Sequence, residues 1–575
     1  MSPSMAALVS RLPVWLCVSG TFTTLAPLQS AASDLPEFDV ADATCEAKAE
    51  SLMMLQSRAH NTVATMRRKS LWLTDLHADL YYLSDVRQCV KKNVSTLRHF
   101  PFGVMGCDPP ATLLSETLRR ATSMQLDRGA DFALYTGDFS RHNMGKLENP
   151  YKNVSATIGK VSLIFDKHLP NISKVVGTLG NDDTPIGYFQ NITTDRTTNR
   201  WFVTCGEELQ NAHCMTKESR KEYDYGSYFE VRMGNYSILN IATVMYSVFH
   251  KPPNTSGSDP FHQFAWLRRK LTEAARDKRK VWIAGHIPPG IETFGYTELW
   301  EPSYLREYLN IVQDEVMGSV IAAQFFGHVH KDEIRILPNP PPGAGPIFLS
   351  LSLSPVYYNN PAFKTVTWHE NGEVVDFDTF YAQMSNGSSM HYELGYSFRS
   401  LYALKKLSME SFVPFAQELL QGTEQWISYA KWYTATYPND LNSFATNASD
   451  PPSVQKQKAL RRQQYVCGVT IQSMESFEDC VESARLSIYK SVQDDLGAKA
   501  PLAPLVKAVP KTLDVKKHMI IARLLRWAEL SERPEAFDIL RLAEQHHWME
   551  LLQRYGPAVE RSWEEGISLD DFFQR

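Results

Sequence analysis

With 575 residues and 43% apolar side chains, the chain is long enough for a large catalytic domain and a smaller second domain, because single hydrophobic cores stop growing at about 250 to 300 residues. Its 21% charged and 11% aromatic residues are typical of a globular protein and exclude a disordered or fibrous chain. A formal net charge of −5 provides no overall basic field, so we expect no binding to a nucleic-acid duplex.

Residues 1–32 have the features of a secretory signal peptide. Arg11 precedes an apolar stretch that runs from Leu12 to Leu28, and the small residues Ser30 to Ala32 suit a cleavage site. Polar residues interrupt this stretch, which is weaker than the run of about 20 apolar residues that a membrane-spanning helix needs. An uncleaved signal anchor is the alternative, but we expect no stable span in the mature chain.

Glycosylation sequons and cysteines agree with passage through the secretory pathway. Asn-X-Ser/Thr sequons begin at Asn93, Asn153, Asn171, Asn191, Asn235, Asn254, Asn386 and Asn447. Three cysteine pairs lie close enough in sequence to form local disulfides, namely Cys89/Cys107, Cys205/Cys214 and Cys467/Cys480. Cys17 lies in the signal segment and Cys45 is left over. Because no CxxC pair is present, an oxidising compartment is a simpler explanation than a structural zinc site.

The next part of the chain is typical of an α/β domain. Residues 33–68 form a polar, helix-like lead-in, after which short apolar runs alternate with sharp polar turns and helix-like segments. The runs expected to form buried strands are Leu71–Leu73, Phe132–Tyr135, Val175–Val176, Val281–Ile283 and Ala323–Phe326. Functional residues gather at the carboxyl ends of such strands. We therefore place a catalytic domain at residues 69–385.

From about residue 390 the apolar pattern changes to a helical period. Ile520, Leu524 and Trp527 recur at helical spacing, and Pro534 breaks the run. Such a stripe is more often core packing than a membrane or partner surface. The pattern predicts a small helical C-terminal domain over residues 386–575.

Five short motifs occur in order, each after one of the apolar runs. They are Asp75-Leu76-His77, Gly137 to His142, Gly180 to Asp183, Gly285-His286 and Gly327 to His330. One such motif alone is weak evidence for a metal site, because a single buried histidine is more often a core residue than a ligand. Five in order indicate a common site, and their residue types are those of a two-metal centre. Two divalent ions about 3.5 to 4 Å apart need imidazole nitrogens, hard oxygens and one bridging carboxylate.

The motifs supply a complete set of ligands for two ions. Asp138 is the candidate for the bridging carboxylate. Asp75, His77 and His330 would complete one metal site, and Asn181, His286 and His328 would complete the other. We expect His328-Val329-His330 to be extended, since residues i and i+2 of a strand point the same way and can reach adjacent ions. Glycines before the ligands allow tight turns, and zinc is the expected metal because it binds imidazole strongly.

The order DxH, GDxxxH, GN, GH, GHxH resembles the calcineurin-like metallophosphoesterase superfamily. Within it, His286-Ile287-Pro288-Pro289-Gly290 and the Gln324 to His328 segment are similar to the acid sphingomyelinase-like phosphodiesterases and the vacuolar endopolyphosphatases. The resemblance covers roughly residues 70 to 400. It implies a β-sandwich flanked by helices, and hydrolysis of phosphodiester or phosphoanhydride bonds by a metal-bridging hydroxide that attacks phosphorus in line.

Three further residues are catalytic candidates through this resemblance. His142 matches the histidine that contacts phosphate in sphingomyelinase-like members, with a surface histidine as the alternative. Arg141 can add a bidentate phosphate contact, or can pair with Asp182 or Asp183. Asp182 stands where most of the superfamily has the histidine of GNH, and a phosphoanhydride needs a donated proton less than an alkyl diester does. That favours an anhydride substrate, unless a protonated Asp182 is the general acid in an acidic lumen.

The sequence therefore predicts a dinuclear phosphoesterase that is secreted or resides in the vacuolar or lysosomal lumen. Its substrate would be a phosphate-containing small molecule, a lipid headgroup or polyphosphate. True acid sphingomyelinases carry a six-cysteine saposin domain, and residues 33–68 contain only Cys45, so autonomous extraction of membrane lipids is not expected. A catalytically impaired protein that binds a phosphate ligand is the alternative, and only Asp182 supports it.

Overall fold

The computed structural model describes residues 17–18, 21–22, 67–85, 97–192, 200–252, 259–384, 389–450, 452–490, 509–510, 515–531, 534–565, 569 and 573. The chain divides into two units, Met1–Met66 and Arg67–Arg575. In the first unit the description covers one antiparallel pair, β1 (Cys17–Val18) with β2 (Thr21–Phe22). Most of the predicted signal segment and the lead-in up to Met66 lie outside the described residues.

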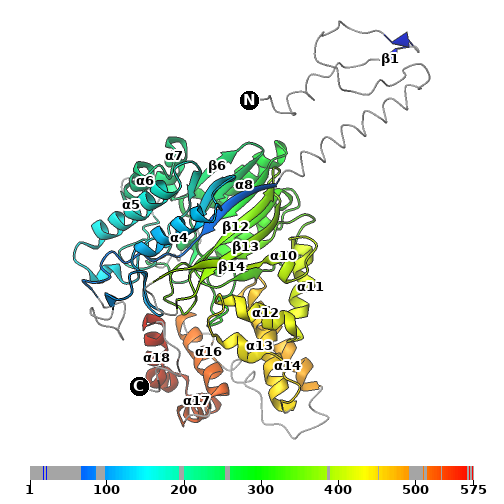
Figure 1. Ribbon diagram of the computed structural model, residues 1–575. Helices are drawn as coiled ribbons and strands as arrows, with labels where there is room; N and C mark the ends of the chain where they lie inside the picture. The colour runs from blue at the N-terminus through cyan, green and yellow to red at the C-terminus, as the bar shows by residue number, and fades with distance from the viewer. Residues whose placement is uncertain are drawn as a thin grey trace. The chain divides into compact units, whose positions relative to one another are not determined.

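Two six-stranded sheets form the centre of the second unit (Figure 1). The first has the order β10-β11-β9-β8-β7-β6 and consists of β6 (Phe229–Met233), β7 (Tyr236–Asn240), β8 (Lys280–Ala284), β9 (Ile321–Phe326), β10 (Glu333–Arg335) and β11 (Ile347–Leu349). The second has the order β14-β13-β12-β3-β4-β5 and consists of β3 (Arg67–Leu73), β4 (Ala130–Tyr135), β5 (Ser173–Val176), β12 (Ala362–His369), β13 (Val374–Ala382) and β14 (Tyr392–Ser397). All five predicted strands are confirmed, as β3, β4, β5, β8 and β9.

The direction of these strands brings the five motifs to one edge. Strands β3, β4 and β5 are parallel neighbours in the second sheet, and β7, β8 and β9 are parallel neighbours in the first. Each strand that precedes a motif therefore ends at the same side of its sheet as its parallel neighbours. This is the arrangement in which side chains that follow the strands can converge.

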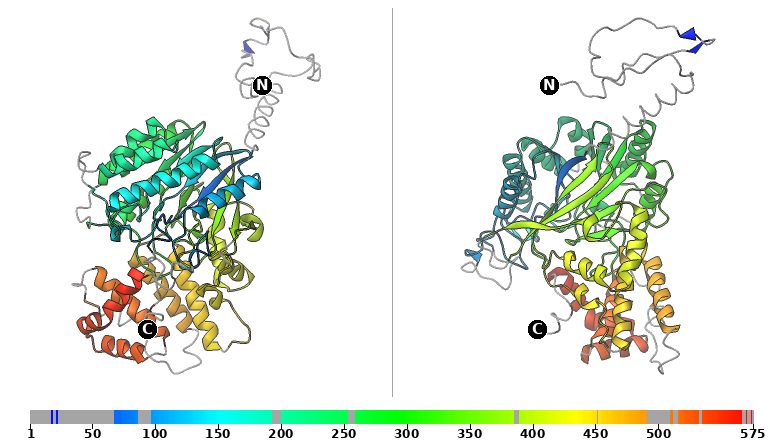
Figure 2. Two further views of the ribbon diagram at one scale, coloured as in Figure 1. Left: turned by 60° about the vertical axis from the view of Figure 1, so that its left-hand side comes forward. Right: turned by 45° about the vertical axis from the view of Figure 1, so that its right-hand side comes forward.

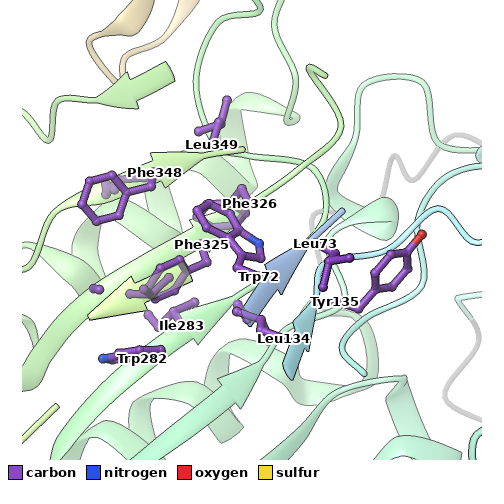
Figure 3. Packing of buried hydrophobic residues seen from close by; sticks show 14 of the residues in the cluster. Trp72, Leu73, Leu134, Tyr135, Trp282, Ile283, Phe325, Phe326, Phe348 and Leu349 are labelled. Atoms are coloured by element: carbon purple, nitrogen blue, oxygen red, sulfur yellow. The ribbon is translucent and has the colours of Figure 1, made fainter. Parts of the chain in front are cut away.

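Aromatic side chains fill the space between the two sheets (Figure 3). Trp72 of β3 packs against Phe325 of β9, with ring centroids 4.9 Å apart, and Phe132 of β4 packs against Trp282 of β8 at 5.5 Å. All four side chains are fully buried. Since each pair joins one sheet to the other, the inner faces interdigitate as in a β-sandwich. The predicted fold class, an α/β sandwich flanked by helices, is confirmed.

Helices accompany the sheets and follow them in the chain. Those within the sheet region are α4 (Thr112–Ser123), α5 (Pro150–His168), α6 (Arg200–Asn211), α7 (Lys217–Gly226), α8 (Gln263–Arg276) and α9 (Pro302–Val312). Helices α5, α6 and α7 lie side by side (Figure 2). After β14 come α10 (Phe398–Leu401), α11 (Met409–Leu420), α12 (Glu424–Tyr433), α13 (Pro452–Val469), α14 (Met474–Lys490), α16 (Val515–Leu530), α17 (Pro534–Glu544) and α18 (Trp548–Glu565). The predicted helical C-terminal region is thus present.

The C-terminal helices belong to two different hydrophobic cores. Phe415 and Tyr465, from α11 and α13, are part of the same buried cluster as the sheets. Ile520, Leu524 and Trp527 of α16 instead form a separate cluster with residues of α17 and α18. The apolar stripe predicted from the sequence is therefore core packing among the last helices. Within the described ranges, no helix combines the length and the apolar character needed to cross a membrane.

Candidate metal centre

The structure brings all seven predicted ligands together in two adjoining clusters. Asp75, His77 and His330 form one, and Asp138, His286 and His328 form the other; within each, the ligand atoms lie within 4.8 Å of one another. Asn181 joins the second cluster, because its Oδ1 lies 3.1 Å from Nε2 of His286. These side chains group in space as the motifs predicted.

One carboxylate oxygen lies between the two clusters. Oδ2 of Asp138 is 3.3 Å from Nε2 of His77 and 3.1 Å from Nε2 of His286. Nε2 of His77 also lies 3.0 Å from Nε2 of His330. Two imidazole nitrogens at this distance repel unless a proton or a cation lies between their lone pairs. The donor set, imidazole nitrogens around a shared carboxylate, therefore fits a pair of divalent ions.

Burial keeps several of these imidazoles in the form that a metal requires. It lowers the pKa of His77 to about 4 and that of His328 to about 3, and it holds the pKa of His330 well below the usual value. These rings are therefore neutral at physiological pH. Neutral imidazole is the form that binds a metal ion without first losing a proton.

Backbone carbonyls orient two of the histidines. Nδ1 of His77 lies 3.1 Å from the carbonyl oxygen of Ser140, and Nδ1 of His286 lies 2.8 Å from that of Thr136. A hydrogen bond at Nδ1 fixes the tautomer and leaves the Nε2 lone pair directed at the cluster. Both rings are thus arranged to bind through Nε2.

Five of the ligands have a strained backbone that the sequence did not reveal. Asp75, His77, Asp138, His328 and His330 have φ angles of 48°, 49°, 57°, 70° and 62°. This left-handed region is uncommon for residues other than glycine, and such strain is concentrated at functional sites. The expectation that His328-Val329-His330 is extended is therefore wrong. The turn is stabilised by Asp75, whose carboxylate accepts the backbone N–H of His328 at 3.0 Å.

Two glycines make room for the ligand carboxylates. A Cβ atom on Gly180 would collide with the carboxylate and the backbone nitrogen of Asp138, and one on Gly327 would collide with the side chains of Thr74 and Asp75. The expected role of glycines in bringing the backbone close to the site is therefore confirmed at these two positions.

We expect Gly180→Ala to weaken metal binding by about 100-fold, the upper range for changes next to a ligand, because the new methyl group must displace Asp138. Equilibrium titration with Zn²⁺ against a chromogenic chelator measures the change. Gly556→Ala is the matched control, since the nearest atom to its Cβ is 3.7 Å away. Unchanged affinity in the Gly180 variant would mean that Asp138 does not contribute to the ions.

His142 lies beside the first cluster and is held by a carboxylate. Its Nδ1 is 2.9 Å from Oδ1 of Asp108, and its backbone N–H donates to Oδ2 of the same residue at 2.9 Å. Its ring stacks on that of His77, with centroids 4.2 Å apart. On the other side, Nε2 is 3.1 Å from the Tyr357 hydroxyl and 3.6 Å from Oδ2 of Asp182. The interpretation as a surface histidine is not supported, because this ring faces the ligands.

Asp182 and Asp183 occupy different environments. The Asp182 carboxylate accepts a hydrogen bond from Nδ2 of Asn181 at 2.7 Å, and burial raises its pKa to about 7. Asp183 accepts hydrogen bonds from the backbone N–H groups of Phe139, Ser140 and Gly180 at 2.8 to 3.0 Å. Asp182 therefore belongs to the site, whereas Asp183 ties two of its loops together.

Arg141 is not placed to contact a substrate. Its side chain is 1% exposed and bonds to Oδ2 of Asp79 at 3.2 Å and to Oδ2 of Asp85 at 2.6 Å. Neither of the expected partners, Asp182 and Asp183, is its partner. The two carboxylates of the loop after His77 neutralise this guanidinium.

The predicted disulfides have three different outcomes. Cys467 and Cys480 are joined at an S–S distance of 1.96 Å, as predicted. Cys107 is disulfide-bonded, while Cys89, its expected partner, lies outside the described residues. The predicted Cys205/Cys214 disulfide is wrong, because both residues are buried thiols. The Cys214 thiol donates instead to the carbonyl oxygens of Ser162 and Ala212.

The sequons differ in exposure. Asn171, Asn235 and Asn447 are exposed, and Asn153 and Asn191 are partly exposed. Asn93, Asn254 and Asn386 lie outside the described residues, so the structure adds nothing for these three.

Two residues of the site carried no signal in the sequence. Asp108 pairs with His142 across 34 positions, and Tyr357 reaches the same histidine across 215 positions. Neither stands in a short motif with the ligands. Only the fold brings them to the site.

Several known proteins are similar to this chain. The sphingomyelinase phosphodiesterase D of Dictyostelium discoideum is 29% identical over 310 residues, which cover 52% of this chain and 67% of that protein. The cyclic GMP-AMP phosphodiesterase SMPDL3A of Rattus norvegicus is 23% identical over 434 residues, which cover 71% and 91%. Among solved structures, a dimetal phosphatase from Danio rerio is similar with 11% identity and a TM-score of 0.33, covering 54% of this chain and 95% of that one. No protein-family model matches the chain. The chain is thus similar to proteins that are named as sphingomyelinase-like phosphodiesterases, as its motifs predicted.

Proposed function

We propose that this protein is a metal-dependent phosphodiesterase that uses two divalent ions, held by Asp75, His77 and His330 on one side and by Asn181, His286 and His328 on the other. The observation that carries the proposal is the position of Asp138, whose Oδ2 faces both clusters. When bound, two such ions supply an activated water and neutralise the charge on the phosphoryl oxygens. Zinc is the metal that we propose, since imidazole nitrogens dominate the donor set.

His142 supplies the proton that the leaving group needs. Asp108 holds its Nδ1, so the proton on Nε2 lies on the side of Asp182, whose Oδ2 is 3.6 Å away. Burial opposes its protonation, but the charges of Asp108, Tyr357 and Asp182 outweigh burial and raise the pKa of His142 well above the usual value. The ring therefore carries a proton at neutral pH. Its side chain is 20% exposed, which leaves it accessible to a substrate.

A diester is a better substrate than a long polyanion for this site. Arg141 is the only Lys or Arg in the five motifs, and Asp79 and Asp85 neutralise it. Asp182 adds a further carboxylate next to His142. Apart from the single charge on His142, a polyphosphate chain would find no cationic side chain of the motifs that is not already neutralised. A diester carries less charge, and the relatives named above are phosphodiesterases by name.

Hydrolysis of phosphoanhydrides is the second candidate, and Asp182 is the residue that favours it. This carboxylate stands where most of the superfamily has a proton-donating histidine, and an anhydride has a good leaving group without that proton. The two candidates share the metal site and differ only in how the leaving group departs.

The test measures metal content and substrate range together. Purified full-length protein should contain about two equivalents of transition metal and should cleave bis-p-nitrophenyl phosphate. Phosphocholine release from sphingomyelin, nucleotide hydrolysis and shortening of polyphosphate are then compared at acidic and neutral pH. Cleavage of polyphosphate alone would establish the anhydride function. A folded protein without metal or activity would instead favour a role in phosphate-ligand binding.

We expect Asp182→His to raise turnover of alkyl phosphodiesters several-fold, because a second imidazole next to His142 can protonate an alkoxide. Turnover of bis-p-nitrophenyl phosphate should change little, since p-nitrophenolate leaves without a proton. The ratio of the two rates measures the effect independently of enzyme concentration. An unchanged ratio would mean that this position does not handle the proton.

We also propose that the protein enters the secretory pathway and works outside the cell or in a vacuolar or lysosomal lumen. The disulfide between Cys467 and Cys480 supports this, because such bonds persist in oxidising compartments. Exposed sequons such as Asn171, Asn235 and Asn447 are accessible for glycosylation. Mass spectrometry of the expressed protein before and after removal of N-glycans tests the proposal.

A further inference from the structure

His330 differs from two other histidines of the site in how its ring is held. Nδ1 of His77 faces the carbonyl oxygen of Ser140, and Nδ1 of His286 faces that of Thr136. Nδ1 of His330 is buried and has no hydrogen-bond partner within the described part of the chain. A metal-binding histidine usually depends on such a bond for its orientation. Something other than a ring hydrogen bond must therefore position this imidazole.

The chain directly after His330 is anchored by Asp332, a buried carboxylate. Its Oδ2 accepts hydrogen bonds from Nζ of Lys364 at 2.7 Å and from the hydroxyl of Tyr396 at 2.5 Å. Lys364 belongs to β12 and Tyr396 to β14, both in the second sheet, whereas His330 follows β9 of the first. The backbone N–H of Asp332 also donates to the carbonyl oxygen of Tyr433, at the end of α12, at 3.1 Å. We call Asp332, Lys364 and Tyr396 the anchor.

The anchor cannot move without a large energetic cost. The Lys364 side chain is fully buried, and its ammonium group lies 4.2 Å from the centroid of the Phe377 ring. A buried ammonium without its carboxylate is strongly unfavourable. Asp332 is therefore held at a fixed place against β12. Because Asp332 is two residues from His330, the backbone of the metal ligand is fixed with it.

A second contact restrains the same loop. The His330 ring meets the Tyr357 ring edge to face, with centroids 4.7 Å apart. Nζ of Lys331 donates to the backbone carbonyl of Tyr357 at 2.7 Å. The residue after His330 therefore holds the segment against which the imidazole packs. Orientation of this ligand comes from its flanking residues.

We propose that Asp332, Lys364 and Tyr396 are positioning residues that set the affinity of the Asp75, His77 and His330 cluster for its ion. The cluster of Asp138, His286 and His328 does not depend on them. This inference deepens the proposed function, because it requires a site that binds two ions. It also gives β12 and β14, which contribute no ligand, a role in metal binding.

The test is a titration of the metal-free full chain with Co²⁺, in which binding is measured by calorimetry and by visible absorption. The unmodified protein should bind two equivalents. Tyr396→Phe should weaken one equivalent about tenfold and Lys364→Met should weaken it about 100-fold, the range for partners of a ligand, while the other equivalent is unchanged. Lys270→Met is the matched control, because it removes a lysine that pairs with Glu222 and Glu230 at 2.9 and 2.8 Å and should leave both equivalents unchanged.

Each outcome shows whether the anchor sets the affinity of one metal site or only stabilises the fold. Two unchanged equivalents in Tyr396→Phe and Lys364→Met, or equal weakening of both, would overturn the inference. If Lys364→Met does not fold, Tyr396→Phe decides alone, since it keeps the ion pair and removes one hydroxyl group. Fewer than two equivalents in the unmodified protein would contradict the proposed function itself, and that result is distinguishable because it precedes any substitution.

Discussion

Asp138→Asn is expected to reduce kcat/KM for bis-p-nitrophenyl phosphate by at least about a thousandfold, equivalent to roughly 4 kcal/mol of transition-state stabilisation. The physical reason is that Oδ2 of this residue lies 3.3 Å from Nε2 of His77 and 3.1 Å from Nε2 of His286. An uncharged amide cannot share one anionic oxygen between two cations. Steady-state kinetics and metal analysis of the same preparation measure the loss.

Asp131→Asn is the control for this substitution. Asp131 lies on the preceding strand, β4, and pairs with Arg68 at 2.7 Å in a partly exposed position. The same chemical change there should leave activity and metal content near those of the unmodified protein. If Asp138→Asn keeps two bound ions and most of its activity, the shared carboxylate has no catalytic role and the proposed mechanism is wrong.

The sequence predicted which side chains come together because their positions depend on local rules. Strands β3, β4, β8 and β9 are short apolar runs, and each ends next to a motif. Parallel strands place their ends together, so Asp75, Asp138, His286 and His328 converge once the two sheets pack. The convergence of these four side chains therefore follows from patterns that a single sequence displays.

The geometry within the site was less predictable, because it depends on contacts between distant segments. The backbone is left-handed at His328, and its N–H donates to the Asp75 carboxylate, which is 253 positions away. The pairing of Arg141 with Asp79 and Asp85 arises from a loop that no motif marks. Sequence spacing alone shows neither contact.

Sequence spacing also gave a wrong disulfide prediction for one pair of cysteines. Cys205 lies within α6, while Cys214 lies beyond its end, where the thiol faces the carbonyl oxygen of Ser162 on α5. Cys467 and Cys480 have a separation of 13 and do form a disulfide between α13 and α14. Proximity in sequence therefore permits a disulfide, but the direction of the side chains decides whether it forms.

His142→Ala is expected to slow the hydrolysis of alkyl phosphodiesters by about a hundredfold to ten-thousandfold, the contribution of a general acid. Hydrolysis of bis-p-nitrophenyl phosphate should fall by less than about tenfold, because its leaving group departs without a proton. The difference follows from the arrangement of the ring, with Asp108 at Nδ1 and with Nε2 beside the Tyr357 hydroxyl and the Asp182 carboxylate of the site. Rates for a series of diesters with leaving groups of increasing pKa measure it.

His213→Ala is the matched control, since it removes an exposed histidine that pairs with Asp166 at 3.2 Å outside the site. It should leave the whole series unchanged. Equal losses across the series in His142→Ala would indicate that this ring binds phosphate rather than donates a proton. A steeper dependence on leaving-group pKa would instead show that the Asp108 and His142 pair replaces the proton donor that Asp182 displaced, and would explain how a chain without the usual histidine cleaves diesters.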